Sequence, residues 1–179
     1  MFPVESRHLV AIGVAPKTAE LYLAPLNAAM EEFGITTGER PAMFLAQVGH
    51  ESGAFRYTSE LWGPTKQQLR YDDGGSLARA LGNPPGEGFT WRGHGLIQVT
   101  GYYNHKKVAE HFKIPISDIA AWLTQPAGAC RSAAHFWATH GCNELADSFD
   151  IVGLTKRING GYNGLAERTR LYQILTDLK

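Results

Sequence analysis

Residues 44–53 read FLAQVGHESG, and the fold and the function are both inferred outward from this stretch. Phe44, Val48 and Glu51 follow the i, i+4, i+7 spacing of one helix face, so a glutamate shares a stripe with apolar side chains. An ionisable group on such a stripe is costly to keep charged unless it has a partner. The negative pole at the end of a helix also disfavours a carboxylate. Both effects favour the protonated side chain that a general acid needs, so Glu51 is a candidate catalytic acid.

A second glutamate, Glu60, follows nine residues later. On one continuous helix the two glutamates would point to opposite faces, with their backbones about 13 Å apart. Gly53 removes this obstacle, because glycine readily adopts the left-handed turn that ends a helix. We expect the chain to double back there, with Phe55, Tyr57 and Trp62 anchoring the return. Two glutamates that face each other across a cleft can cleave a glycosidic bond, since one donates a proton and the other activates water or attacks the sugar.

The composition is that of an ordinary globular chain. A length of 179 residues suits one domain that buries a real core, so we expect a single catalytic domain over residues 1–179. The 17 Lys and Arg balance the 17 Asp and Glu, which argues against nucleic-acid binding through a broad basic field. No apolar run reaches membrane-spanning length, and residues 1–7 lack the features of a secretory signal. We therefore expect a monomer made in a cytoplasm, without stable membrane insertion.

Cys130 and Cys142 are the only cysteines, and they lie near the two ends of one predicted helix. Such ends are roughly 18 Å apart, which rules out a disulfide unless the chain turns back after Gly141. Reduced, buried thiols are the expectation for a cytoplasmic product. Two cysteines without neighbouring ligands do not make a zinc site, and the seven histidines offer no ligand cluster. We expect no metal site and no cofactor.

The spacing of the apolar residues is mostly helical. Helices are expected over residues 4–12, Thr18–Phe33 with an interruption at Pro25, Arg40–Glu51, Pro64–Tyr71, Leu77–Leu81, Tyr102–Phe112, Asp118–Leu123, Ala127–His140, Phe149–Ile158 and Leu165–Leu178. The Gly- and Pro-rich stretch Asp72–Gly95 indicates a loop, with a strand or hairpin at Phe89–Arg92 and Leu96–Val99. Ala127–His140 is rich in small residues, so it is the expected central helix. The predicted fold is mainly α, with a helical N-terminal segment 1–35 packed on it and a small β element beside a substrate cleft.

A second informative stretch covers residues 91–104, WRGHGLIQVTGYYN. Its glycines allow the backbone to approach a ligand or another segment closely. Gln98 and Thr100 alternate with apolar residues, so in an extended conformation both polar side chains face the same side. They could hold a water molecule near Glu60 or bind a sugar. A half-exposed strand with ordinary polar residues explains the pattern equally well.

Two residues near the C-terminus are further candidates. Asn159 begins an Asn-Gly-Gly sequence, which is a strong turn signal, and spacing alone favours a simple turn residue. Arg168 shares a stripe with apolar residues of the last helix, so it is expected to point toward the core. A buried guanidinium needs a carboxylate partner. Glu60 is one candidate, and Asp147 or Asp150 is the competing structural explanation.

Three separate segments resemble the family 19 glycoside hydrolases. They are residues 44–53, residues 92–101 (RGHGLIQVTG) and residues 158–164 (INGGYNG). The segments look closest to the bacteriophage endolysin and prophage lysozyme branch, and the similarity extends from about Ala28 to the C-terminus. The resemblance implies a lysozyme-like, mostly α fold that includes a small β element. It also implies an inverting mechanism that needs no metal or organic cofactor.

The resemblance also implies roles for individual residues. Glu51 matches the general acid, Glu60 the general base, and Thr100 the hydroxyl residue that helps to hold the attacking water. Arg168 matches an arginine that supports the charge network of the active site. The positions that match sugar-binding polar residues are Gln98, Asn104 and Asn159.

The chain departs from the family pattern in three places. Leu61 follows Glu60 at a position where the family usually has an asparagine, so Glu60 lacks one polar neighbour. Asn163 stands where the chitinases have a glutamate, so the network around Arg168 lacks that carboxylate. The loop between Tyr71 and Trp91 is short compared with some endolysins, which affects the number of sugar subsites.

These features predict an endolysin that hydrolyses β-1,4 bonds in the glycan strands of bacterial peptidoglycan. It would wait in the host bacterial cytoplasm until a separate holin opens the membrane, and then act on the wall in the periplasm. No separate cell-wall-binding domain is expected. The enzymatic alternatives are a chitinase acting on N-acetylglucosamine polymers and a lytic transglycosylase. From another class, a glycan-binding module without catalysis is disfavoured by the presence of both glutamates, Gln98 and Thr100.

Overall fold

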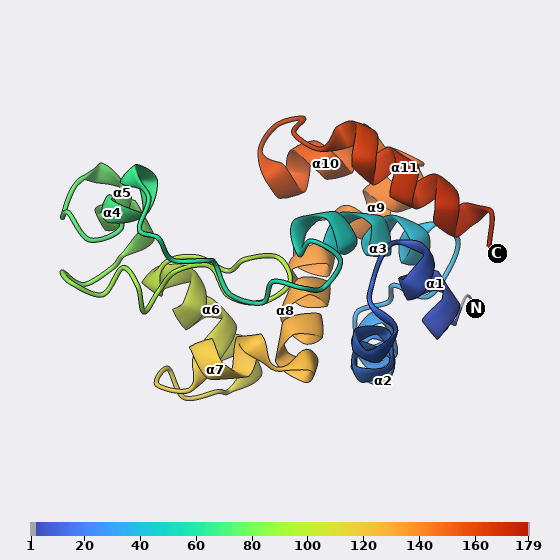
Figure 1. The fold of residues 1–179 in the computed structure, drawn as a ribbon. Coiled ribbons are helices and arrows are strands. Elements are labelled where there is room, and N and C mark those ends of the chain that lie inside the picture. The colour runs from blue at the N-terminus through green and yellow to red at the C-terminus, as the bar shows by residue number, and fades with distance from the viewer. Residues whose placement is uncertain (1–2, 179) are drawn as a thin grey trace.

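A computed structural model describes residues 3–178, which form helices and connecting turns arranged in two lobes (Figure 1). The helices are α1 (Ser6–Ala11), α2 (Pro16–Glu32), α3 (Arg40–Glu51), α4 (Lys66–Leu69), α5 (Ser76–Leu81), α6 (Tyr102–Phe112), α7 (Ile119–Thr124), α8 (Pro126–Thr139), α9 (Cys142–Asp147), α10 (Ile151–Asn159) and α11 (Leu165–Thr176). Helices α4 to α7 form the smaller lobe on the left of Figure 1, and the other helices form the larger lobe. The predicted mainly α fold is confirmed, and residues 1–2 of the predicted N-terminal segment lie outside the described part.

The larger lobe is built around α3 and α8. Residues Pro41–Gly49 of α3 are all buried, and α3 packs against α9, α10 and α11. The rings of Phe44 on α3 and Trp137 on α8 meet edge to face, with centroids 5.4 Å apart. Helix α8 also contacts α2 in the same lobe and α7 in the smaller lobe. The small-residue helix is therefore the element that joins the two lobes.

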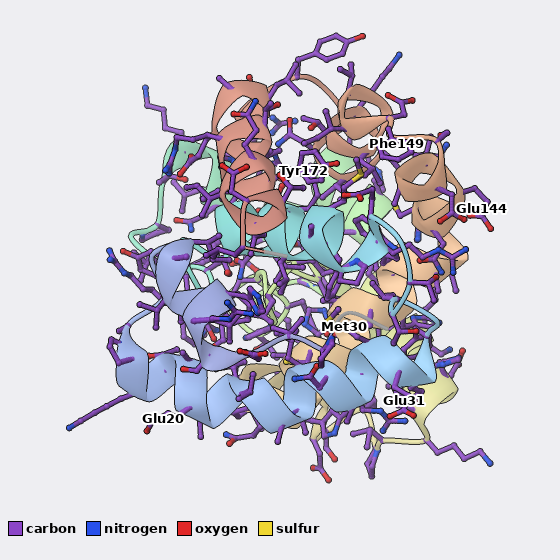
Figure 2. All side chains as sticks on the ribbon, turned by 90° about the vertical axis from the view of Figure 1, so that its right-hand side faces the viewer. Glu20, Met30, Glu31, Glu144, Phe149 and Tyr172 are labelled. Carbon is purple, nitrogen blue, oxygen red and sulfur yellow. The ribbon has the colours of Figure 1, made fainter. Side chains whose placement is uncertain are left out.

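The predicted interruption of the second helix at Pro25 is wrong, because α2 continues through it from Pro16 to Glu32. Its inner face buries Tyr22, Leu26, Ala29 and Met30. Figure 2 shows α2 at the front, with Glu20 and Glu31 on its outer side and Met30 turned inward. A proline inside a helix removes one backbone hydrogen bond. Burial of four inner side chains, at roughly 1.5–3 kcal/mol for each large apolar one, outweighs that loss.

The smaller lobe has its own apolar cluster. Its buried members are Trp91, Val108, Ala109, Ile119 and Leu123. The predicted β element is reduced to isolated bridges between Ser59 and His94 and between His94 and Val99. The predicted strand at Phe89–Arg92 is wrong, since the Trp91 amide donates to the Glu87 carbonyl oxygen in a turn.

The segment after α8 also differs from the expectation. Gly141 follows the end of α8 with a left-handed φ of 67°, and it directly precedes helix α9, which the spacing did not predict. The next helix begins at Ile151 rather than Phe149, whose φ is 60°. Cys130 and Cys142 are free and buried as expected. Burial raises the pKa of the Cys142 thiol to about 12. Across residues 3–178, no helix combines the length and the apolar character needed to span a membrane.

We predict that Gly128→Ala lowers the free energy of unfolding by about 3 kcal/mol, because the new Cβ would overlap the Trp122 carbonyl oxygen between α7 and α8. Urea denaturation measures the change. Gly161→Ala is the control, since its Cβ would meet nothing closer than 3.8 Å and its effect should stay within about 0.5 kcal/mol. Equal stability of the two variants would show that the α7–α8 contact is not close.

Candidate active site

Glu51 lies in the last turn of α3 and has a buried cationic partner. Arg168 on α11 donates hydrogen bonds from Nη2 to Glu51 Oε1 and from Nη1 to Gln47 Oε1. The Arg168 side chain is 0% exposed and that of Glu51 is 21% exposed. Glu51 Oε2 accepts no hydrogen bond from any residue of the described chain. One carboxylate oxygen is thus held by the larger lobe while the other is open.

The predicted inward direction of Arg168 and its need for a carboxylate partner are confirmed, but none of the three candidate partners is the observed one. Its carboxylate partner is Glu51 and not Glu60. Asp147 instead pairs with Arg40 at 2.6 Å. Asp150 caps the first turn of α10 by accepting a hydrogen bond from the Gly153 amide at 2.7 Å. The choice of partner follows from the packing of α11 on α3, which spacing along the sequence does not reveal.

The turn after Glu51 takes the predicted left-handed form. Gly53, Ala54 and Phe55 have φ values of 57°, 58° and 63° in succession. The Ser52 hydroxyl donates to the Val48 carbonyl at 2.7 Å and accepts from the Phe55 amide at 2.8 Å, which fixes the turn. Phe55 is buried against α2, whereas Tyr57 is half-exposed. The chain then runs from the end of α3 toward α4 and α5 (Figure 1).

Glu60 is held by the smaller lobe. Its Oε1 accepts hydrogen bonds from Gln68 Nε2 at 2.9 Å and from the Tyr71 hydroxyl at 3.4 Å. Its Oε2 accepts from the Gly93 amide at 2.9 Å. Burial, reinforced by the negative charge of Glu60, raises the pKa of Tyr71. These donors fix the orientation of the carboxylate, as a general base requires.

Gln98 lies next to the backbone that holds Glu60. Its Oε1 comes so close to Gly93 that a Cβ there would be 2.5 Å away, so a side chain at position 93 would displace the Gln98 amide group. The predicted extended conformation of this segment is wrong at Gln98, whose φ is 56° and whose amide donates to the Gly95 carbonyl in a turn. The Thr100 hydroxyl donates to the Gln98 carbonyl at 2.9 Å. Asn104 Nδ2 donates to the Thr100 carbonyl at 2.8 Å.

Gln98, Thr100 and Asn104 line one groove between the lobes, with a volume of about 590 Å³. This is within the range of roughly 300–1,000 Å³ that is usual for small-molecule sites. The opposite wall includes Phe136 on α8 and Ile158 on α10. Glu51 and Glu60 do not line the groove itself, but Glu60 connects to it through Gly93 and Gln98.

Asn159 is exposed at the last position of α10, directly after Ile158, and Gly160 ends the helix with φ 78°. It is thus a helix-end residue rather than an isolated turn residue, and it does not itself line the groove. The structure also adds positions that sequence analysis did not single out. Gln68 and Tyr71 belong to a stretch predicted as a surface helix, yet both are buried against Glu60. A capping sequence, Thr65 followed three residues later by Gln68, was the available signal for that helix start.

A buried histidine pair supports the turn that carries Gln98. His94 Nδ1 and His105 Nε2 are 2.9 Å apart, and His105 Nδ1 donates to the Gly101 carbonyl at 2.8 Å. Burial first, then the nearby charges of His105 and Arg92, lowers the pKa of His94 to about 4, against a weaker opposing effect of the Arg92 carbonyl. His94 is therefore neutral at pH 7 and hydrogen-bonded inside the smaller lobe.

Within residues 3–178, no three His, Cys, Asp or Glu side chains are grouped so that they could hold a metal ion. Glu51 has an open oxygen, and Glu60 is held by three donors next to a groove that carries amide and hydroxyl groups. This arrangement is suited to acid–base cleavage of a polar, extended substrate.

Known proteins are similar to this chain in sequence and in fold. A family 19 glycosyl hydrolase domain-containing protein of Haemophilus influenzae is 34% identical, covering 84% of this chain and 85% of that protein. An endochitinase of Arabidopsis thaliana is 28% identical over 80% of this chain, and the chain spans about half (47%) of its length. The crystal structure of chitinase C from Streptomyces griseus superposes with a TM-score of 0.71, with 18% identity, over 98% of this chain and 77% of that one. No family model matches the chain.

The fold and the similar sequences define a chitinase-like glycoside hydrolase. The chain belongs to the family 19 glycoside hydrolases, as the relative in Haemophilus influenzae shows. The lysozyme-like, mainly α architecture with its small β element agrees with this assignment.

We predict that Arg168→Met lowers the free energy of unfolding by about 3 kcal/mol, because it leaves Glu51 and Gln47 without their common partner. Arg168→Lys should recover only part of the loss, since an ammonium group cannot form the same planar pair of bonds. Arg170→Met, at an exposed position of the same helix, is the control and should change little. If Arg168→Met and Arg170→Met unfold at the same urea concentration, Arg168 does not have this stabilising role.

Because His94 and His105 are buried, we predict that the free energy of unfolding falls in acid. The pKa of His94 is about 4 in the folded protein and near 6.5 in the unfolded chain. Between these values the unfolded chain binds more protons, so the free energy of unfolding falls as the pH is lowered from 6.5 to 4. The contribution of His94 is about 3 kcal/mol, fully present above pH 6.5. Denaturation of the wild type and of His94→Gln at several pH values should give a shallower slope for the variant, and parallel slopes would contradict the assignment.

Proposed function

We propose that the protein hydrolyses β-1,4 bonds in the glycan strands of bacterial peptidoglycan with inversion at the anomeric carbon. The observation that carries the proposal is the contrast between the two glutamates. Glu51 is held through one oxygen by Arg168, and its open Oε2 can carry a proton to the glycosidic oxygen. Glu60 is fixed in a cradle of donors beside the groove, where it can accept a proton from water. The water then attacks the anomeric carbon from the opposite face.

The remaining site residues would bind the sugars and the water. Thr100 supplies a hydroxyl whose oxygen is free to accept a hydrogen bond while its hydrogen is directed to the Gln98 carbonyl. Asn104 on α6 lines the groove, and Asn159 ends α10 directly after the groove residue Ile158. Trp62 and Phe89, whose rings meet with centroids 5.6 Å apart, add an aromatic surface beyond Glu60. Apolar and aromatic surface with a few polar groups is the usual lining of a small-molecule site.

Chitin is the alternative substrate. The endochitinase of Arabidopsis thaliana and chitinase C of Streptomyces griseus are similar proteins whose names state that activity. Chitin and peptidoglycan share the β-1,4 linkage of N-acetylated sugars, so the same two glutamates would serve either polymer. The role in cell lysis, with release from the cytoplasm through a holin, rests on the resemblance of the three motifs to the phage branch.

The test compares Glu51→Gln and Glu60→Gln with the wild type on purified sacculi and on chitin hexasaccharide. Each substitution should reduce kcat by at least about 10²-fold, because each removes one proton transfer. Glu110→Gln is the matched control, since Glu110 is exposed and makes only a 3.9 Å contact with Lys106. The amide oxygen at position 51 can still accept from Arg168, and thermal unfolding of each variant checks that the fold is kept.

The products decide the mechanism and the substrate class. NMR of fresh digests should show the α anomer, as inversion of a β bond requires. An anhydro sugar end with Glu60→Gln fully active would assign a lytic transglycosylase instead. Cleavage of chitin with intact sacculi would assign a chitinase. Binding of sacculi without cleavage by the wild type would leave a glycan-binding module.

A further inference from the structure

The groove that carries Gln98, Thr100 and Asn104 is also lined by basic side chains. They are Lys107 on α6, His135 near the end of α8, and His140 directly after α8. No aspartate or glutamate of the described chain lines this groove. The chain as a whole is neutral, with 17 basic and 17 acidic residues, so the one-sided charge is a local property of this surface.

Lys107 supplies the fixed positive charge. It is exposed and lies three residues after Asn104, so the two side chains share one side of α6. It forms no ion pair with any side chain of residues 3–178, whereas its neighbour Lys106 lies 3.9 Å from Glu110. The ammonium group at position 107 is therefore available to a ligand in the groove.

His140 presents one ring nitrogen to the groove. Its Nδ1 lies 2.8 Å from the Phe136 carbonyl, which can only accept, so Nδ1 carries the hydrogen. The ring also stacks on Phe136 with centroids 3.8 Å apart, which fixes its plane. With the hydrogen on Nδ1, the Nε2 edge can only accept, so it suits a sugar hydroxyl rather than a carboxylate. At His135, burial and then the neighbouring His111 and His140 lower the pKa, so this ring is neutral at pH 7.

We infer that Lys107 binds a carboxylate carried on every second sugar of the substrate, and so selects peptidoglycan over chitin. This inference rests on the proposed function and names the residue that would set its specificity. In peptidoglycan every second sugar bears a lactyl ether, which is either a free carboxylate or the attachment point of a peptide with carboxylates. Chitin has only neutral hydroxyl and acetamido groups. An uncompensated lysine in the sugar groove favours the anionic polymer and gains nothing from the neutral one.

The test measures kcat/KM of Lys107→Gln on three substrates: intact sacculi, glycan strands stripped of peptide by an amidase, and chitin hexasaccharide. Loss of one solvent-accessible ion pair should reduce the value on the anionic substrates about two- to fivefold, through KM, and leave chitin unchanged. Lys106→Gln removes the same charge one residue away, outside the groove, and should behave as the wild type.

The substrates separate the two sources of the carboxylate. A loss on stripped strands assigns the lactyl group, and a loss on intact sacculi alone assigns the peptide. An equal loss on chitin, or no loss on either anionic substrate, overturns the inference. Calorimetric binding of muramic-acid-containing and chitin oligosaccharides to Glu51→Gln and to Glu51→Gln/Lys107→Gln gives a second readout. A wild type inactive on sacculi would refute the proposed function, while this binding comparison would still decide on the carboxylate site.

Discussion

The buried guanidinium of Arg168 is the interaction on which the rest of the site depends. A charged group with no exposed surface needs hydrogen-bond partners, and here Gln47 and Glu51 bind Nη1 and Nη2 from one face of α3, while Nε has no partner within residues 3–178. Gln47 Nε2 in turn lies 3.4 Å from Thr155 Oγ1 on α10. The network therefore ties three helices together at the point where the catalytic candidate leaves the helix. The same contact that stabilises the larger lobe also orients Glu51.

Two glycines complete this arrangement, because at each of them the backbone lies very close to a neighbouring side chain. Gly164 precedes α11 with φ 75°, and a Cβ there would overlap the ring of His50. His50 also pairs with Glu167 at 2.8 Å, so the start of α11 is seated on the last turn of α3. Gly93 plays the matching part in the smaller lobe, where its amide binds Glu60 and its missing side chain admits Gln98. Gly93 and Gly164 of the family-like segments thus have a packing reason, whereas a Cβ at Gly160 would meet nothing within 4 Å.

Local periodicity was enough to predict most helices, and it placed Arg40–Glu51 with its observed limits. It also gave the inward direction of Arg168, because direction depends only on the position around one helix. It could not give the partner of Arg168, because that depends on how α11 crosses α3. For the same reason periodicity does not predict the hydrogen-bond donors around Glu60, because Gln68 and Tyr71 reach it from a neighbouring turn. The turn at Gln98 overrode an alternating pattern that favoured a strand.

The two glutamates are held by different lobes, and this constrains how the site can work. Glu51 is bonded to α11 in the larger lobe, whereas Glu60 is bonded to Gln68 and Gly93 in the smaller one. Their separation is therefore set by the packing between the lobes, through α8 and the turn that buries Leu96 in the core of the larger lobe. A substrate lying in the groove contacts both lobes. In the proposed mechanism, binding energy from remote sugars would hold the two lobes in the arrangement that spaces the proposed acid and base correctly, which is how distant contacts contribute to the rate.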